Sequence, residues 1–262
     1  MTANRYFYDH VVGQIHYRDT GGDKEVLICL HEMPLSSEVF MPMLSHLGGN
    51  YRVMTPDFPG FGESFHPKSP LTIEQVALYF NEWLEDLGVT SFSIFGVHGG
   101  AGLAIEMALQ RPGLVKSLIL SGVPLFTRKE RNKLHHGLPS LVIQRDGNHL
   151  MQWWTYFEEK FKVDATENMI QNALLQILRA GPCYEWGYRA AFDYDPEPAL
   201  RRLSQPIYLL VAEGDVLKDK NNHVKMISEH VKDETIINVP GQLSQRVPEK
   251  TAEKIHQFLT TF

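Results

Sequence analysis

Short, continuous apolar runs alternate with helix-forming segments along most of this 262-residue chain. Such runs are typical of strands that are covered on both faces, and they predict strands at residues 25–30, 51–57, 91–97, 115–121, 207–212 and 235–239. The spacing of apolar residues between them predicts helices at 72–87, 99–111, 222–231 and 248–262. Because strands separated by helices need crossover connections, we expect an α/β fold with a mostly parallel sheet. Residues 6–9 and 12–18 instead favour an antiparallel hairpin at its edge.

One segment interrupts this alternation. Residues 125–204 contain no strand-like run but hold three of the four tryptophans and several tyrosines. Helices are predicted at 141–162 and 167–180, so the segment is interpreted as a helical cap over a core formed by residues 1–124 and 205–262. The alternative is that its aromatic residues only pack the insertion onto the core.

Composition excludes several classes of function. With 25 basic and 31 acidic residues the formal net charge is −6, and no Lys/Arg cluster is present, which argues against a nucleic-acid partner. No apolar run approaches the roughly 18 residues that span a bilayer, and the first residues lack the features of a secretory signal. Two cysteines cannot form a disulfide framework, so we expect a cytoplasmic protein that binds a small molecule.

Unusual residues follow four of the predicted strands. They are His31-Glu32-Met33-Pro34, Gly96-Val97-His98-Gly99-Gly100, Glu213-Gly214-Asp215 and Gly241-Gln242. Ligands of open α/β sheets lie beyond the carboxyl ends of the strands, so these segments are the candidate site. No metal-ligand spacing and no dinucleotide fingerprint is found in the sequence, and we expect neither a metal nor a cofactor.

These motifs resemble the α/β-hydrolase superfamily, in the haloperoxidase and C–C hydrolase style with a helical cap. The resemblance rests on YRVMTPDFPGFGES at residues 51–64, on the glycines at 96 and 100, and on Arg111-Pro112. It implies the α/β-hydrolase fold with an eight-stranded, mostly parallel sheet and helices on both faces. The phrases LHEMPLSS, GVHGG, GVPLFT and DGNHL resemble a bacterial branch with histidine in place of the nucleophilic serine.

The chain departs from the superfamily's triad at two positions. The G-x-S-x-G turn, which presents the nucleophile, here carries His98, and the histidine after the last strand is replaced by Gln242. Asp215 retains the acid position, although it could instead cap the turn in which it lies. Glu32 lies in the oxyanion loop, where it could act in catalysis, bond the loop backbone or face solvent.

From this resemblance His98, Asp215 and Glu32 are the candidate catalytic residues. The backbone N–H groups of Met33 and Gly99 are the candidate oxyanion hole. Candidate substrate contacts are His31, Trp153, His149 and Gln242, and for His149 local bonding to the backbone is the alternative.

Three functions remain open. The first is a cofactor-independent enzyme on an ester, lactone or other carbonyl compound, in which His98 acts as base, acid or nucleophile. The same base would serve a lyase or an isomerase. The second is a ligand-binding protein without catalysis, and the third is a protein-interaction scaffold. The sequence also leaves a homodimer open.

Overall fold

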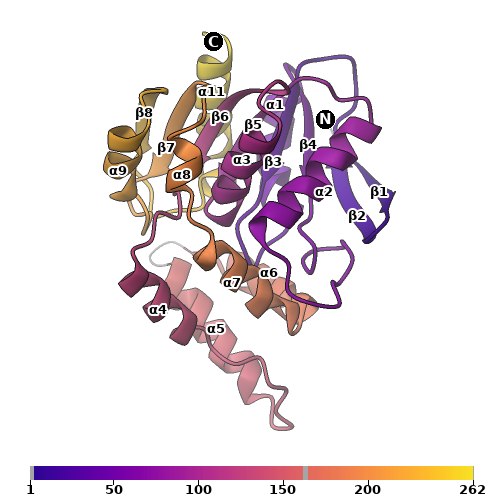
Figure 1. Cartoon of the computed structure of the whole chain (residues 1–262). Helices are drawn as coiled ribbons and strands as arrows, with labels where there is room; N and C mark the ends of the chain where they lie inside the picture. The colour runs from indigo at the N-terminus through magenta and orange to yellow at the C-terminus, as the bar shows by residue number, and fades with distance from the viewer. Residues whose placement is uncertain (1–2, 162–164, 262) are drawn as a thin grey trace.

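The computed structural model describes residues 3–161 and 165–261 and contains one eight-stranded sheet. The strand order is β1-β2-β4-β3-β5-β6-β7-β8 (Figure 1). Their bounds are β1 Asn4–His10, β2 Gly13–Asp19, β3 Val26–Leu30, β4 Arg52–Pro56, β5 Phe92–Val97, β6 Val115–Ser121, β7 Ile207–Ala212 and β8 Val231–Ile237. Strands β1 and β2 form the expected antiparallel edge hairpin, and β3 to β8 pair in parallel. The predicted fold class is confirmed.

Helices cover the sheet. On the face turned to the viewer in Figure 1, α2 (Ile73–Asp86) packs against α3 (Gly99–Gln110). Behind the sheet, α11 (Pro248–Leu259) packs against α1 (Met41–Leu47). A reciprocal capping box between Thr72 and Gln75 fixes the start of α2, as the sequence predicts. Short helices complete the core: η1 Ser37–Phe40, α8 Glu197–Leu200, α9 Lys220–Ile227 and α10 Leu243–Arg246.

Of the five helices described between β6 and β7 in the sequence, four form a separate group below the sheet (Figure 1). They are α4 Arg128–His136, α5 Asn148–Phe161, α6 Glu167–Ala180 and α7 Cys183–Asp193. Helix α7 reaches the end of the sheet where α3 begins, because a Cβ built on Gly99 would lie 3.5 Å from the Ala191 Cβ. The division into core and cap stays a prediction, but this contact brings the inserted helices to the candidate site.

Several element bounds differ from those expected. Helix α5 begins at Asn148 rather than at 141, because Gly147 adopts a φ of 77° and the Asp146 side chain accepts a hydrogen bond from the Asn148 N–H. Its predicted end at 162 lies outside the described residues. Strand β8 begins four residues earlier than expected, since Lys232, Asp233 and Glu234 lie on an exposed sheet edge and give no apolar run.

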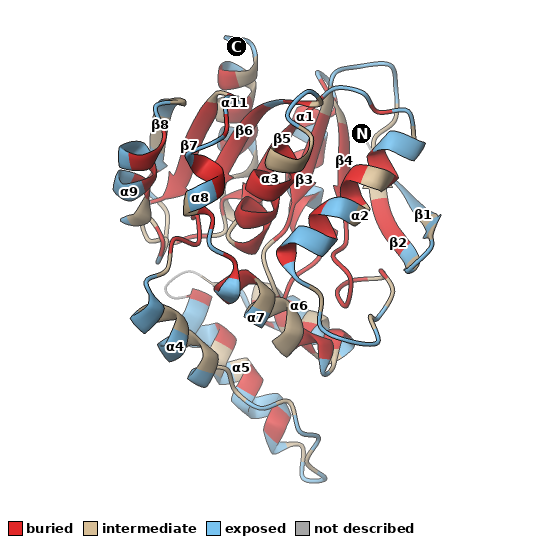
Figure 2. Cartoon of the chain, viewed as in Figure 1, coloured by how far each residue is buried: buried red, intermediate tan, exposed pale blue. Residues whose placement is uncertain are grey.

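The central strands and α3 form the middle of the core, whereas strand β1 at the sheet edge is largely exposed (Figure 2). No helix in the described ranges, 3–161 and 165–261, is long and apolar enough to cross a membrane.

Candidate active site

His98 lies at the tip of a sharp turn between β5 and α3. Its φ of 47° is in the left-handed region, and its N–H donates to the Ser121 carbonyl at 2.8 Å. The two flanking glycines leave the space that this turn requires. A Cβ on Gly96 would lie 2.4 Å from the Gly100 carbonyl oxygen, and one on Gly100 would lie 2.2 Å from the Leu30 carbonyl oxygen. The turn therefore keeps the geometry of a nucleophile elbow although it carries histidine.

His98 bonds directly to Asp215. The distance from His98 Nε2 to Asp215 Oδ2 is 2.8 Å, and the other carboxylate oxygen accepts the Leu217 N–H at 2.8 Å. Asp215 thus bonds to the histidine and also caps its own turn, so the two alternatives considered from the sequence do not exclude each other.

Gly122 makes this bond geometrically possible. Strand β6 lies between β5 and β7, so the His98 ring must cross the end of β6 to reach Asp215 after β7. The first residue after β6 is Gly122, and a Cβ there would lie 2.3 Å from His98 Cδ2 and 2.7 Å from Nε2. Any larger residue at 122 would collide with the ring. Sequence reasoning missed Gly122, although glycine directly after a central strand was an available signal.

The electrostatic surroundings favour the charged form of His98. Burial lowers its pKa, but the charge and hydrogen bond of Asp215, together with the charge of Glu32, outweigh burial and raise the pKa to about 9. About a third of the side chain (34 %) remains exposed. Nδ1 has no hydrogen-bond partner among residues 3–161 and 165–261, so this nitrogen is available to a ligand or to water.

Glu32 is the second acid of the site. Its carbonyl accepts hydrogen bonds from Leu35 N–H and from His31 Nδ1, which hold the backbone of the loop. Burial raises the pKa of its carboxyl; the positive charge of His98 and a hydrogen bond from the backbone of Glu32 itself oppose this rise, and the negative charge of Asp215 adds to it. Oε2 of Glu32 is buried and has no partner in the described part of the chain.

The candidate oxyanion hole is formed by backbone groups on either side of the elbow. The Met33 side chain lies over Gly99, because a Cβ built on Gly99 would be 2.4 Å from the Met33 sulfur. Neither the Met33 nor the Gly99 N–H donates to another described residue. Gly99 begins α3, where the first N–H groups of a helix have no partner within it. Both N–H groups are therefore free to bind a ligand oxygen.

His31 is a structural residue in this conformation. It is fully buried, donates from Nδ1 to the Glu32 carbonyl and accepts the Phe58 N–H at Nε2, at 3.1 Å in each case. Both ring nitrogens are thus used within the protein, and none is left for a substrate. Its role is to join the loop after β3 to the loop after β4.

The other three predicted substrate contacts also have partners within the protein. Trp153 is fully buried in the helical group, where it packs edge-on against Tyr156 and Tyr184. His149 is buried and accepts the Gln144 N–H, which is the local bonding named as its alternative. Gln242 accepts a hydrogen bond from Arg246 at 3.2 Å. None of these observed contacts brings the three residues to His98.

Two tyrosines of the inserted helices, Tyr156 on α5 and Tyr188 on α7, lie close to each other. Burial raises the pKa of Tyr188 well above its ordinary value, and the neighbouring Tyr156 and the charge of Glu32 add to this rise. Helix α7 therefore carries a phenol within the electrostatic range of Glu32. Neither position belongs to a sequence motif, and the insertion shows only an excess of aromatic residues.

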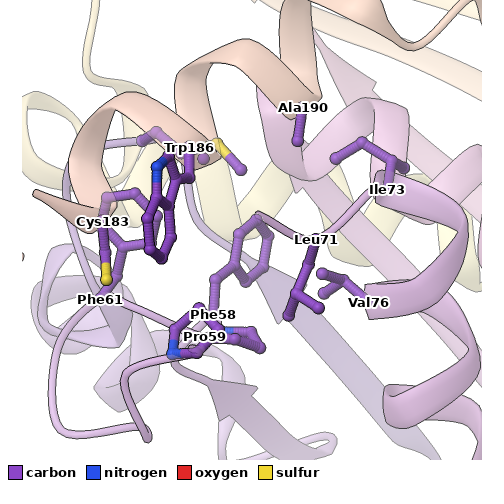
Figure 3. Close-up of a pocket in the computed structure, with 12 residues that line it drawn as sticks. Phe58, Pro59, Phe61, Leu71, Ile73, Val76, Cys183, Trp186 and Ala190 are labelled. Atoms are coloured by element: carbon purple, nitrogen blue, oxygen red, sulfur yellow. The ribbon is translucent and has the colours of Figure 1, made fainter. Parts of the chain in front are cut away.

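An apolar pocket lies beside these polar groups. It lies between the loop after β4, the start of α2 and α7 (Figure 3). Its wall includes Phe58, Phe61, Leu71, Val76 and Trp186. Met33 also lines it and thus joins the pocket to the elbow. The pocket is narrow, and its side chains already fill most of it.

No group of three or more His, Cys, Asp or Glu that could hold a metal ion is found in the described ranges. His135 and His136, which are adjacent in sequence, bond to different partners: His135 to the Asp193 carboxylate and His136 to the Asn132 carbonyl.

Three comparisons relate the chain to known proteins. Haloalkane dehalogenase 2 of Mycobacterium bovis is 28 % identical over 115 residues, which cover 44 % of this chain and 40 % of that protein. The chain thus aligns with about two fifths of the length of that relative. The magnesium-chelatase 30 kDa subunit of Rhodobacter capsulatus is 26 % identical over 75 % of this chain and 73 % of its own. A putative lipase from Acinetobacter baumannii superimposes with a TM-score of 0.82 at 17 % identity, covering 99 % of this chain and 92 % of that chain.

The family model described as alpha/beta hydrolase fold matches residues 25–168, which is more than half of the chain. The match includes the loop after β3, the β4 motif and the elbow. This chain belongs to the α/β hydrolase fold family.

Proposed function

We propose that this protein is an enzyme that hydrolyses a small ester, lactone or related carbonyl compound without a cofactor, with His98 as its general base. The observation that carries the proposal is the arrangement of His98, whose Nε2 is bonded to Asp215 while Nδ1 is unbonded at the elbow. A histidine oriented by a carboxylate, with one nitrogen available, is the arrangement of a general base.

Two substitutions compensate for each other in this scheme. The family's serine and histidine are both absent, at 98 and 242. His98 makes the bond to Asp215 that a histidine at 242 would make in the family's triad. The elbow thus supplies the base itself, and water replaces the serine hydroxyl as nucleophile.

The proton and the electrons balance as follows. Neutral His98 accepts at Nδ1 a proton from water as the water oxygen attacks the carbonyl carbon. The resulting oxyanion accepts hydrogen bonds from the Met33 and Gly99 N–H groups. When the carbon–oxygen bond of the ester breaks, the imidazolium returns the proton to the leaving alkoxide. Base, orienting carboxylate and oxyanion donors all come from this chain.

A lyase or isomerase step is the second candidate. In that reaction Nδ1 removes a proton from the carbon next to the carbonyl group, and the same N–H groups stabilise the enolate. The absence of a hydroxyl nucleophile at position 98 favours this lyase or isomerase step, which needs only a base. Two free cysteines, Cys29 and Cys183, support a reducing cytoplasm as the place of either reaction.

The test is a turnover panel of activated esters, lactones and ketones that can lose an α proton, measured on the wild type and His98→Ala. His46→Ala is the matched control, because His46 lies exposed on α1. We expect turnover on at least one substrate that is lost in His98→Ala and retained in His46→Ala. Turnover that survives His98→Ala contradicts the proposal. Binding without any turnover favours a ligand-binding protein.

A further inference from the structure

Glu32 has an unmet hydrogen-bonding requirement. Its Oε2 is buried without a partner in the described part of the chain, although buried polar atoms are almost always hydrogen-bonded. The backbone on either side is fixed, because the Glu32 carbonyl accepts two hydrogen bonds and the Met33 side chain packs over Gly99. The backbone that carries this carboxyl is therefore held in place, and a group outside the described chain can supply the missing hydrogen bond to Oε2.

The surroundings of this oxygen belong to the candidate active site. Glu32 is within electrostatic range of His98, Asp215 and Tyr188. The next residue along the chain, Met33, lines the apolar pocket of Figure 3. A ligand that places its carbonyl oxygen at the Met33 and Gly99 N–H groups thus lies beside Met33, whose neighbours are Glu32 in the sequence and the apolar pocket in space.

We propose that the substrate carries an O–H or N–H donor on the carbon next to its reacting carbonyl group, and that Glu32 Oε2 accepts this donor while an apolar substituent packs against the Met33 side chain. The substrate class is thus an α-hydroxy or α-amino carbonyl compound with a hydrocarbon substituent. This inference rests on the proposed function for the position of the carbonyl group.

The charges of the site support a donor rather than an anion. Two acidic side chains, Glu32 and Asp215, lie near one histidine, so a carboxylate or phosphate on the ligand would be repelled when both are ionised. A hydroxyl or ammonium group meets no such repulsion and removes the cost of an unpaired buried oxygen. Hydrogen bonds to charged groups are among the stronger ones in proteins.

The test measures binding of ketones, which cannot be hydrolysed, by calorimetry, so its result is independent of hydrolysis. The probes are methyl ketones whose α carbon carries a butyl chain together with a hydroxyl, an amino, a methoxy or no further group. We expect the hydroxy or amino ketone to bind at least about tenfold more tightly than the methoxy and unsubstituted ketones. The hydroxy and amino probes distinguish the two donor types.

Glu32→Gln is the matching variant, because it keeps the size of the side chain and replaces a pure acceptor by an amide. The preference for the donor-bearing ketone is expected to fall to less than about threefold, while the exposed control Glu249→Gln leaves it unchanged. Equal affinities in the wild type, a preference for the methoxy ketone, no binding of any probe, or a preference that persists in Glu32→Gln each overturn the inference. Failure of hydrolysis with the donor preference intact contradicts the proposed function instead.

Discussion

Replacement of Asp215 by asparagine tests the His98–Asp215 pair directly. The substitution keeps the shape of the side chain and an oxygen for the Leu217 N–H, but it removes the charge that faces His98 Nε2 at 2.8 Å. Burial lowers the pKa of His98, and in the variant only the charge of Glu32 opposes this effect. We expect the pKa of His98 to fall from about 9 to near or below its ordinary value of 6.5.

The size of the effect follows from the pKa. A rise of the His98 pKa from 6.5 to about 9 corresponds to about 3 kcal/mol of stabilisation of the folded state. We reduce this free energy to about 2 kcal/mol, because a third of the side chain is exposed to solvent, which screens the charges. A folded-state pKa above the unfolded one contributes stability that is fully present below pH 6.5 and is lost as the pH rises through 9. The stability advantage of the wild type over Asp215→Asn should therefore shrink by about 2 kcal/mol between these two pH values.

Two measurements check this prediction. Histidine NMR titration gives the pKa of His98 in both proteins, and urea unfolding at about pH 6 and about pH 9.5 gives the free energies. Asp23→Asn is the control, since Asp23 is exposed. A His98 pKa below 7 in the wild type, or the same pKa in both proteins, would refute the electrostatic argument.

Two further predictions concern the geometry of the elbow. Gly122→Ala places a Cβ 2.3 Å from the His98 ring, so we expect about 1–3 kcal/mol of destabilisation in urea unfolding and a lower pKa of His98 by NMR; an unchanged pKa contradicts the crowding argument. Combining His98→Ser with Gln242→His restores the family's triad, and mass spectrometry should then detect covalent labelling of residue 98 by a fluorophosphonate that leaves this position unlabelled in the wild type. Absence of labelling in a folded double variant would show that the elbow does not present its residue as inferred.

The sequence predicted elements best where hydrophobic burial alone decides them. Strands β6 and β7 begin and end where their apolar runs do, because both lie inside the sheet. Helix α4 was missed, although Thr127 and Glu130 form a capping box that its sequence spacing indicates. Helix α7 has no comparable signal, because no side chain caps its start and its Gly187 lies against Phe61 and Met33 of distant segments.

The candidate site was predictable as a set of loops but not as a set of contacts. The family's glycine spacing places His98 at the elbow. The hydrogen bond from His98 to Asp215 depends on the small size of Gly122. Gly122 lies next to both of these residues because β6, which it follows, is placed between β5 and β7. His31 was predicted to bind substrate, yet its two bonds to neighbouring loops depend on the tertiary arrangement. Tyr188, whose pKa the charge of Glu32 helps to raise, lies on a helix that was not predicted from the sequence.

The central claim is that His98 transfers the proton in catalysis. Its most direct test is the pH dependence of kcat/KM on a substrate found by the turnover panel, which reports the pKa of the essential base in the free enzyme. For the wild type we predict a kcat/KM that rises with pH to a plateau, with an apparent pKa of about 9, and no measurable turnover by His98→Ala. A kcat/KM that is constant or falls through this pH range, or one that His98→Ala retains, would contradict the account.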